Sequence, residues 1–399
     1  MTDPKEIGIS SAFITDGKFE GKLFTERKDF IVQEIGLDGK TLSIENSGES
    51  SEEMGKQKSF LAATLVKDGL STHEALSILS RENNLNIRRI GYLGNKDRNA
   101  VTSQRLSFFK VMPNRLKKEY RKMFLKDLQY SDTGCKIGEL QGNHFIVRIR
   151  EFKGFERLDS FISEVVNKGV PNFYGPQHFG ASALNIQISK DILSKDFKAA
   201  VDKYLFAERS ESSAFAENRL ILAQKFRNRV IGDSEQHDDT SSGVDSFLGM
   251  RTERDMIQHL IANKHDYIGA LRIIPKYLRL LILQSFQSYV FNLSISESIK
   301  KDSLKEYLPT IGYDMENNGA DKDAQGLVMS VMQSQGISDP TALWIKEMPE
   351  VSLKSFIRPS KTYPKNVSYV REYDDLVLSF DLDKGAYATI FLFEMFKRF

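Results

Sequence analysis

The residue types that could do chemistry are concentrated in one short stretch, residues 91–104, which reads Gly-Tyr-Leu-Gly-Asn-Lys-Asp-Arg-Asn-Ala-Val-Thr-Ser-Gln. Asp97 lies there between Lys96 and Arg98, and these two positive charges would favour the ionised form of its carboxylate. The glycines at positions 91 and 94 allow backbone angles that other residues avoid. The pattern indicates a carboxylate nucleophile or base on a shaped loop.

An ordinary surface turn is the main alternative for this stretch, because turns are also rich in Gly, Asn, Asp and Lys. A GTPase is a second alternative, since Asn95-Lys96-Asp97 is similar to the base-reading motif of that class. That motif needs a further residue before the Asp. It also needs a phosphate loop, and the nearest candidate, Gly48 to Lys56, has six residues between its glycines instead of four, with Gln57 where Ser or Thr would bind magnesium. We therefore exclude the GTPase.

Charge is unevenly distributed along the chain. The 399 residues carry a formal net charge of only +2, so attraction of a polyanion must come from local patches. Between Arg81 and Lys126 there are thirteen Lys and Arg against three acidic residues, and the stretch Lys354 to Arg371 has five cations and no acid. A solvated helix face remains the alternative for residues 114–126.

Residue usage excludes several classes of protein. Cys135 is the single cysteine, so neither a disulfide framework nor a cysteine-based zinc site is possible, which fits a reducing cytoplasm. The six histidines show no metal-ligand spacing. Residues 1–10 show no targeting pattern, and no run reaches the roughly 18 apolar residues of a membrane span. We expect a soluble, cytoplasmic protein without metal, cofactor or nucleotide, and a monomer by default.

Regular elements are expected on both sides of residues 91–104. The sequence predicts strands, from alternation or β-rich composition, over residues 30–35, 60–67, 105–111, 142–150 and 376–380. It predicts helices over residues 71–84, 114–126, 161–167, 276–300 and at the C-terminus. The first of these helices begins with a capping box, Ser71-Thr-His-Glu74. In the strand 142–150, Phe145 would lie on an apolar face and Arg148 on the opposite, polar one.

Two further segments are irregular. Residues 169–180 read Gly-Val-Pro-Asn-Phe-Tyr-Gly-Pro-Gln-His-Phe-Gly, and the alternation of Gly and Pro with aromatics predicts a rigid loop where one domain meets another. Residues 232–247 are acidic and Ser-rich and are expected to form a mobile surface segment.

Five blocks of the sequence occur in the order of one known family. Gly-x-Lys-Asp-Arg-x-Ala-Val-Thr-x-Gln at residues 94–104 is similar to a catalytic loop, and Gly-Asn-x-Phe provides Asn143 and Phe145. The remaining blocks are residues 171–180, 287–292 and 385–389. Together they resemble the TruD family of tRNA pseudouridine synthases, along nearly the whole chain.

This resemblance implies an enzyme that isomerises uridine to pseudouridine in tRNA, with position 13 of the D arm as the family's preferred target. It implies an α+β pseudouridine synthase fold, with a mixed, largely antiparallel sheet flanked by helices. The catalytic domain would comprise residues 1–170 and 359–399. Residues 171–358 would form an inserted α/β TRUD-type domain.

The resemblance also implies roles for single residues. Asp97 would be the nucleophile, Asn143 would orient it, and Phe145 would stack on the flipped uracil. Lys96 and Phe30 would support the active site. A base buried in an RNA helix must be extruded before it can be isomerised, and an aromatic ring partly restores the stacking energy. RNA contacts are expected from Arg88, Arg89, Arg98, Arg105, Gln177 and Arg358.

Three positions depart from the family pattern. Phe24 stands where many relatives have lysine, His178 replaces an arginine, and residues 355–358 only loosely resemble the Gly-Thr-x-Arg element. These departures concern RNA specificity more than the chemistry of Asp97. Two alternatives stay open: a non-catalytic RNA-binding protein on the same fold, which would have little use for a carboxylate facing an anionic ligand, and the same enzyme acting on another RNA.

Overall fold

The computed structural model of the chain describes residues 3–10, 13, 19–46, 56–180, 183–208, 213–232 and 250–398. The segment predicted to be mobile, residues 232–247, lies outside these residues except for its first position. The chain divides into two compact units. We call Ile14–Val170 with Thr362–Lys397 the sheet unit, and Met1–Phe13, Pro171–Lys361 and Arg398–Phe399 the helical unit.

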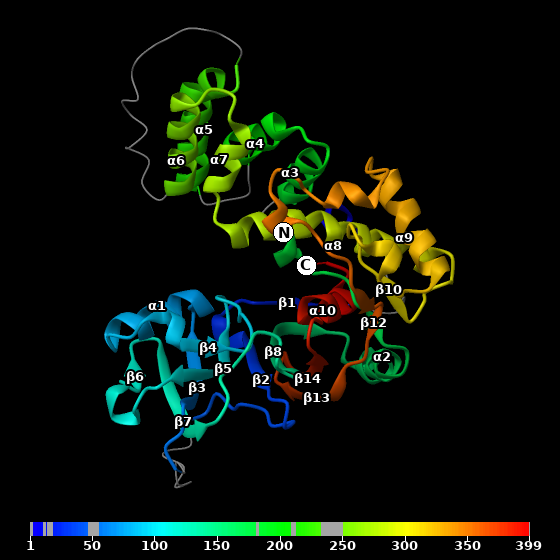
Figure 1. The fold of residues 1–399 in the computed structure, drawn as a ribbon. Coiled ribbons are helices and arrows are strands. Elements are labelled where there is room, and N and C mark those ends of the chain that lie inside the picture. The colour runs from blue at the N-terminus through cyan, green and yellow to red at the C-terminus, as the bar shows by residue number, and fades with distance from the viewer. Residues whose placement is uncertain are drawn as a thin grey trace. The chain divides into compact units, whose positions relative to one another are not determined.

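In the described residues of the sheet unit, ten strands form one sheet. They are β1 (Glu20–Lys22), β2 (Phe30–Ile35), β3 (Phe60–Asp68), β4 (Ile90–Tyr92), β5 (Val101–Phe109), β6 (Glu119–Tyr120), β7 (Met123–Ser131), β8 (Gly142–Lys153), β13 (Lys365–Glu372) and β14 (Asp375–Asp383) (Figure 1). Within the described residues the order is β13-β14-β8-β2-β5-β3-β7-β6, with β1 beside β8 and β4 beside β5. Of the strand pairs in this described sheet, only β2 and β5 run parallel. The fold is therefore α+β with a mixed, largely antiparallel sheet, as predicted.

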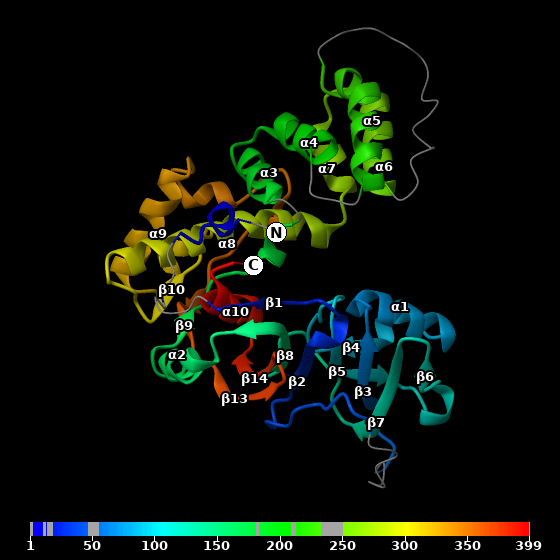
Figure 2. The ribbon, with the colours of Figure 1, turned by 180° about the vertical axis from the view of Figure 1, so that it is seen from behind.

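Three α-helices accompany this sheet: α1 (Thr72–Glu82), α2 (Phe155–Lys168) and α10 (Ala388–Phe396) (Figure 2). The predicted capping box at the start of α1 is confirmed. The Glu74 N–H donates to Ser71 Oγ at 3.2 Å, and the Ser71 N–H donates to Glu74 Oε2 at 2.7 Å. These two bonds satisfy amides that the first helical turn leaves without partners.

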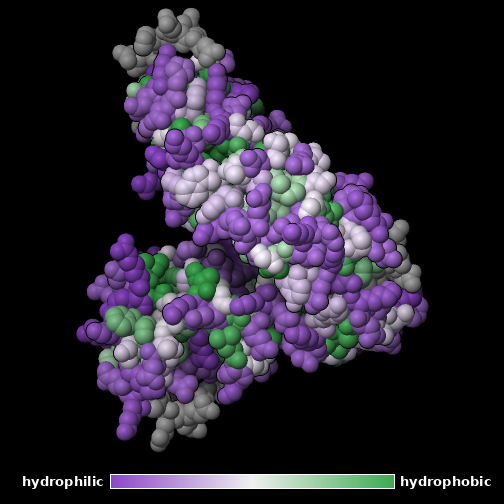
Figure 3. Space-filling model, turned by 45° about the vertical axis from the view of Figure 1, so that its right-hand side comes forward, coloured by the Kyte–Doolittle hydropathy of each residue, from purple (hydrophilic) through white to green (hydrophobic). Residues whose placement is uncertain are grey.

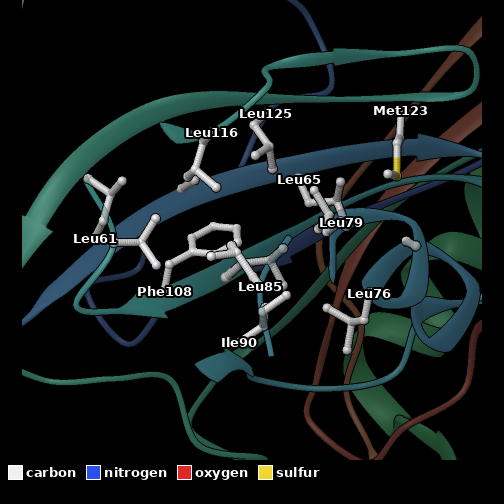
Figure 4. Packing of buried hydrophobic residues seen from close by; sticks show 14 residues of the cluster. Leu61, Leu65, Leu76, Leu79, Leu85, Ile90, Phe108, Leu116, Met123 and Leu125 are labelled. Atoms are coloured by element: carbon white, nitrogen blue, oxygen red, sulfur yellow. The ribbon is translucent and has the colours of Figure 1, made fainter. Parts of the chain in front are cut away.

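The core of this region lies between α1 and the strands. Leu61, Ala63 and Leu65 alternate along β3 and are fully buried. Figure 4 shows Leu76 and Leu79 of α1 among the side chains of the same cluster. Burial of each large aliphatic side chain contributes about 1.5–3 kcal/mol, so this cluster fixes α1 on one face of the sheet.

That face also carries three of the candidate site residues, Phe30, Asn143 and Phe145. Opposed residues of paired strands share a face, and so do alternate residues of one strand. Lys67 opposes Thr102 across β3 and β5, Val32 opposes Thr102 across β5 and β2, and Val32 also opposes Phe145 on β8. The shared face therefore includes Phe30, Glu34, Lys67, Gln104, Asn143, Phe145 and Phe380.

The helical unit contains α3 (Leu184–Leu193), α4 (Phe197–Phe206), α5 (Ser213–Val230), α6 (Arg251–Ala262), α7 (Tyr267–Ile273), α8 (Lys276–Lys300) and α9 (Lys322–Ser334). Its strands β10 (Tyr307–Pro309) and β11 (Ile357–Pro359) pair antiparallel. The predicted helix over residues 276–300 is confirmed. Two-residue strands, β9 (Val170–Pro171) and β12 (Lys361–Thr362), lie where the chain passes from one unit to the other.

Residues 3–10 belong to the helical unit, although the expected division grouped them with the catalytic domain. They form a 3₁₀ turn, Pro4–Ile7, and are hydrogen-bonded to α8. Asn292 Nδ2 donates to the Ile7 carbonyl at 2.8 Å, and Ser296 Oγ donates to the Gly8 carbonyl at 2.8 Å. Other 3₁₀ turns are Arg27–Asp29, Ile87–Arg89, Pro113–Arg115, Pro176–His178, Met315–Asn317, Pro340–Leu343 and Pro349–Val351.

The basic helix predicted over residues 114–126 is wrong. The chain forms a 3₁₀ turn there and then enters the hairpin of β6 and β7. Met123 and Leu125 alternate into the core while β7 pairs with β3 from Lys67↔Met123 to Phe60↔Ser131. Pairing along a buried strand thus outweighs the helix preference of the lysines and arginines. The helix predicted over residues 161–167 is present but longer.

The exposed surface of the molecule is mixed in polarity. Figure 3 shows apolar side chains in separate patches among hydrophilic ones. Within the part of the chain that the structure describes, no helix combines the length and the apolar character needed to cross a membrane.

Candidate active site

Asp97 lies on the loop between β4 and β5, and its side chain is partly buried. Buried polar side chains from two elements hold this loop. The Lys96 N–H donates to Oγ1 of Thr72, in the first turn of α1, at 2.9 Å. Gln104 of β5 donates to the Gly94 carbonyl at 3.2 Å and accepts a bond from Thr72 Oγ1 at 3.1 Å. The backbone on the N-terminal side of Asp97 is therefore fixed to both the helix and the sheet.

Lys67, at the end of β3, also supports this loop. It is only 1% exposed, and its ammonium donates to the carbonyls of Leu70 at 2.6 Å, Asp97 at 3.0 Å and Lys96 at 3.4 Å. Burial lowers the pKa of Lys67 to about 8. The negative charge of Asp97 opposes this lowering, the charge of Lys96 adds to it, and that of Glu74 opposes it.

Lys96 is part of a buried polar group with Glu34 and Asn143. Its Nζ lies 3.0 Å from Glu34 Oε2 and donates to Asn143 Oδ1 at 2.9 Å. Glu34 is fully buried and also accepts a bond from the Arg105 N–H at 2.8 Å. Since Glu34 compensates the charge of Lys96, the effect of Lys96 is to tie the Asp97 loop to β2 and β8. Asn143 shares in this attachment through Lys96.

An aromatic column lies on the same face of the sheet. The Phe145 ring stacks on Phe30 at 6.0 Å and on Phe380 at 5.4 Å, measured between centroids, and Phe380 contacts Phe391 at 4.4 Å. At the other end Phe24 meets Phe30 edge-on at 5.1 Å. Phe145 is 6% exposed, whereas Phe24 is 42% exposed and has a left-handed backbone with φ of 56°. The exposed ring of the column is therefore Phe24.

An ion pair supports the start of β2, next to Phe30. Asp29 accepts two bonds from Arg150, each of 2.9 Å. Burial alone would raise the pKa of Asp29, but the bonds from Arg150 and from the Glu26 N–H, together with the nearby positive charges, hold it below its usual value. Asp29 thus anchors the segment that carries Phe30.

The arginines of the sheet unit that were expected to contact RNA divide into two groups. Arg88 is exposed, and Arg98 is largely exposed beside Glu74, at 3.4 Å. The guanidinium of Arg89 instead donates to the Phe109 carbonyl at 2.8 Å and to the Lys110 carbonyl. Arg105 follows Gln104 in β5, so its side chain belongs to the opposite face of the sheet. Arg88 and Arg98 are the better placed of the four for phosphate.

The two expected RNA contacts of the helical unit differ in the same way. Gln177 is exposed. Arg358 is 8% exposed, donates to Asn172 Oδ1 at 2.8 Å and lies 4.2 Å from the centroid of the Tyr174 ring. Burial, followed by the charge of Arg358, lowers the pKa of His178 to about 4. Arg358 is therefore placed as an internal cation and not as a surface contact for phosphate.

The described residues contain no group of three or more His, Cys, Asp and Glu side chains able to hold a metal ion. The predicted absence of a metal from the reaction stays a prediction.

Known proteins share both the sequence pattern and the architecture of this chain. The family model described as tRNA pseudouridine synthase D (TruD) matches residues 6–310 and 298–395. The chain belongs to the TruD family. A relative from Methanococcoides burtonii, named "Probable tRNA pseudouridine synthase D", is 29% identical over 306 residues, which cover 74% of this chain and 64% of the relative. The chain therefore spans less than two thirds of that relative.

Other members of the TruD family match over almost their whole length. A relative of the same name from Methanococcus vannielii is 27% identical, and the match covers 96% of this chain and 97% of the relative. A solved structure from Methanosarcina mazei, which bears the name putative tRNA pseudouridine synthase D (TruD), is 25% identical with a TM-score of 0.72. It covers 98% of this chain and 97% of its own. The fold of the chain is thus shared with a solved TruD structure.

Sequence reasoning missed three side chains that hold the Asp97 loop: Glu34, Lys67 and Thr72. Two of them had a signal. Lys67 continues the row Leu61, Ala63 and Leu65 at a spacing of two, so a charge stands where the pattern calls for a core residue. Glu34 likewise interrupts an apolar strand. A charged residue at a core position of a strand next to a reactive loop is therefore worth testing as part of the site.

Proposed function

We propose that this chain is a tRNA pseudouridine synthase that converts uridine 13 of the D arm to pseudouridine, with Asp97 as nucleophile. The observation that carries the proposal is how the Asp97 loop is held and how far Asp97 is buried. The loop backbone is held by Lys67, Thr72 and Gln104, while Asp97 as a residue is only partly buried. Membership of the TruD family supports the reaction class.

In the proposed reaction the Asp97 carboxylate adds to C1′ of the ribose or to C6 of the uracil. The bond between C1′ and N1 breaks, the uracil turns within the site, a new bond forms between C1′ and C5, and the bond to the Asp97 oxygen breaks, which restores the carboxylate. The proton on C5 leaves and N1 gains one, so atoms and electrons balance without an oxidant or a phosphoryl donor. A carboxylate suits this role because it is compact, anionic and able to leave again.

The uridine must leave its helix before Asp97 can reach it. Flipping costs a few kcal/mol, and stacking on an aromatic side chain returns about 1–3 kcal/mol per base. The aromatic column is the candidate platform. Stacking of the uracil on Phe145 stays a prediction. The Phe145 ring already lies between two other aromatic rings, those of Phe30 and Phe380. Phe24, at the exposed end, offers the open ring.

Phosphate contacts are proposed for the exposed cations of the sheet unit. Arg88 and Arg98 lie in the basic region between Arg81 and Lys126, and Gln177 offers an exposed amide in the helical unit. Replacing one phosphate-binding arginine by alanine should lower the salt dependence of tRNA binding by about one unit of slope.

The test is pseudouridine mapping on unmodified tRNA transcripts incubated with the full chain. We expect one modified position, uridine 13, and no product when that position is changed to cytidine. Modification at another uridine would retain the enzyme and change its target. Tight tRNA binding without pseudouridine in any transcript would favour the non-catalytic RNA-binding protein.

A further inference from the structure

We propose that Lys67 is a positioning residue for the reaction, whose charged ammonium holds the Asp97 backbone and favours the anionic form of the Asp97 carboxylate. The inference rests on the proposed function and adds to it a residue that acts through Asp97. In this role Lys67 is a buried cation that acts on the nucleophile Asp97, which itself is only partly buried.

The hydrogen-bonding capacity of Lys67 is matched by its surroundings. A lysine ammonium has three N–H donors and no acceptor. The three carbonyl oxygens within 2.6–3.4 Å, those of Leu70, Lys96 and Asp97, match these donors one to one. A neutral amine has only two donors, and its lone pair would face a carbonyl oxygen. The arrangement is therefore specific for the charged form.

The charge distribution around Lys67 links it to Asp97. The groups that interact with its charge are Asp97 and Lys96, on the loop, and Glu74, on α1. Lys96 is compensated by Glu34 at 3.0 Å, and Glu74 has Arg98 at 3.4 Å. Asp97 precedes Glu74 in strength among the negative charges that act on Lys67. Because the attraction between two charges is mutual, Lys67 stabilises the anion of Asp97 equally.

The position of Lys67 in the sheet itself favours an apolar residue. Leu61, Ala63 and Leu65 precede Lys67 on the same face of β3, and each is fully buried. A charge at the next position costs free energy of burial that a methionine or leucine would avoid. If Lys67 served stability alone, an apolar residue would suit this position better. The positive charge is useful there if it acts on the Asp97 carboxylate.

Activity and stability should respond to alkaline pH in opposite directions. Because burial sets the pKa of Lys67 near 8, raising the pH through 8 removes the charge and activity falls. The contribution of Lys67 to the free energy of unfolding changes in the opposite direction. Between about pH 8 and 10.5 the unfolded chain binds the Lys67 proton and the folded chain does not, so this group makes the free energy of unfolding rise with pH. The titration of Lys67 would therefore lower activity without lowering stability, and thermal denaturation at each pH separates its effect from unfolding.

The experiment measures single-turnover formation of pseudouridine at saturating tRNA between pH 6 and 9.5. The wild type should become about tenfold slower by pH 9, with a midpoint near pH 8. Lys67→Met should be slower by about 100-fold at pH 7, as expected for a displaced nucleophile, with no step near pH 8. Its thermal midpoint is measured beside the rate, so that the rate is expressed per folded molecule. Lys67→Arg should keep its charge and move the alkaline fall in rate above about pH 9.

Lys153→Met is the matched control, since Lys153 is exposed and pairs with Glu20 at 3.1 Å. It should keep the wild-type rate and pH profile. A wild-type rate that stays level to pH 9.5, wild-type activity in Lys67→Met, or one alkaline limb common to all variants would overturn the role of Lys67. If the variants do not fold, the pH profile of the wild-type rate by itself tests the role of Lys67. A wild type that makes no pseudouridine at any pH would overturn the proposed function itself, and this inference with it.

Discussion

Two loops look most like functional sites in the sequence, residues 94–104 and 171–180. Each of them is held by a different buried cation. Lys67 holds the first by two of its backbone carbonyls, those of Lys96 and Asp97. Arg358 holds the second through Asn172 and lies over Tyr174. The loops differ in what they leave accessible: Asp97 is partly exposed, whereas Phe173 and Phe179 are completely buried.

The loop 94–104 holds a partly accessible Asp97 on a fixed backbone, whereas the loop 171–180 packs its own side chains into the core. Around Asp97 the buried contacts are made by polar side chains to the backbone, and Asp97 itself is only partly buried. In the second loop the aromatic side chains are themselves the packing, and Asn292 bonds the backbone of Tyr174 at 2.7 and 3.0 Å. The first loop stands out in the sequence by its charged residues and the second by its Gly, Pro and aromatic residues, but which side chains are buried becomes clear only in the structure.

The largest effect is expected from Asp97→Asn, which keeps the shape of the side chain and removes its charge. Formation of pseudouridine should fall by about 10³-fold or more, since a carboxamide is a poor nucleophile. The tRNA affinity should change by less than about threefold, and thermal denaturation should be unchanged because the loop is held by its backbone. Turnover within about tenfold of the wild type would remove Asp97 from the mechanism.

Arg358→Met should affect stability and leave the chemistry intact. The change removes a buried bond to Asn172 and a cation stacked on Tyr174, at an expected cost of about 2–4 kcal/mol in the free energy of unfolding. Urea denaturation measures this cost, and the rate per folded molecule should stay within about threefold of the wild type. A stable variant whose tRNA binding shows a salt slope smaller by about one unit would show instead that Arg358 binds phosphate.

The second loop should be sensitive to acid, in contrast to the alkaline sensitivity expected at Lys67. His178 accepts a proton near pH 4 in the folded chain, because of burial and the charge of Arg358, and near pH 6.5 in the unfolded chain. As the pH falls from 6.5 to 4, unfolding takes up a proton and this group lowers stability by up to about 2–3 kcal/mol. In thermal denaturation at pH 7 and pH 5, His178→Gln should lose less stability than the wild type. An equal decrease in both proteins would contradict this assignment.

Much of the fold could be predicted because local patterns and tertiary contacts agree. Ser71 with Glu74 starts a helix by bonds that need no distant partner, and Pro275 precedes the helix 276–300 with its broad apolar stripe. The prediction for residues 114–126 failed for the opposite reason. Its lysines and arginines are good helix formers, but β3 offers a partner strand far away in the sequence, and Met123 and Leu125 gain burial only in the extended form.

The candidate site was predictable in its accessible part and not in its support. Asp97 is carried by a local motif, so its loop could be recognised directly. Lys67 and Glu34 come from strands whose neighbours are apolar, and their meaning depends on strand register that a single sequence does not give. Arg358 shows the converse: a cation in a basic run indicated a surface, and only the three-dimensional packing reveals that it is internal.

The position of β14 in the sheet has a consequence for biosynthesis. β8 ends at Lys153, but its neighbour β14 begins only at Asp375, after Pro171–Lys361 of the helical unit has been synthesised. During translation β8 therefore keeps one edge without its final partner, and Phe145 waits for Phe380. The strands β3 and β5 and the helix α1, which hold the Asp97 loop, are complete by Phe109. A nascent chain can thus assemble the Asp97 loop early, whereas the aromatic column closes only after Phe380 has been synthesised. A chain that terminated before β14 would expose an unpaired strand edge, which favours aggregation.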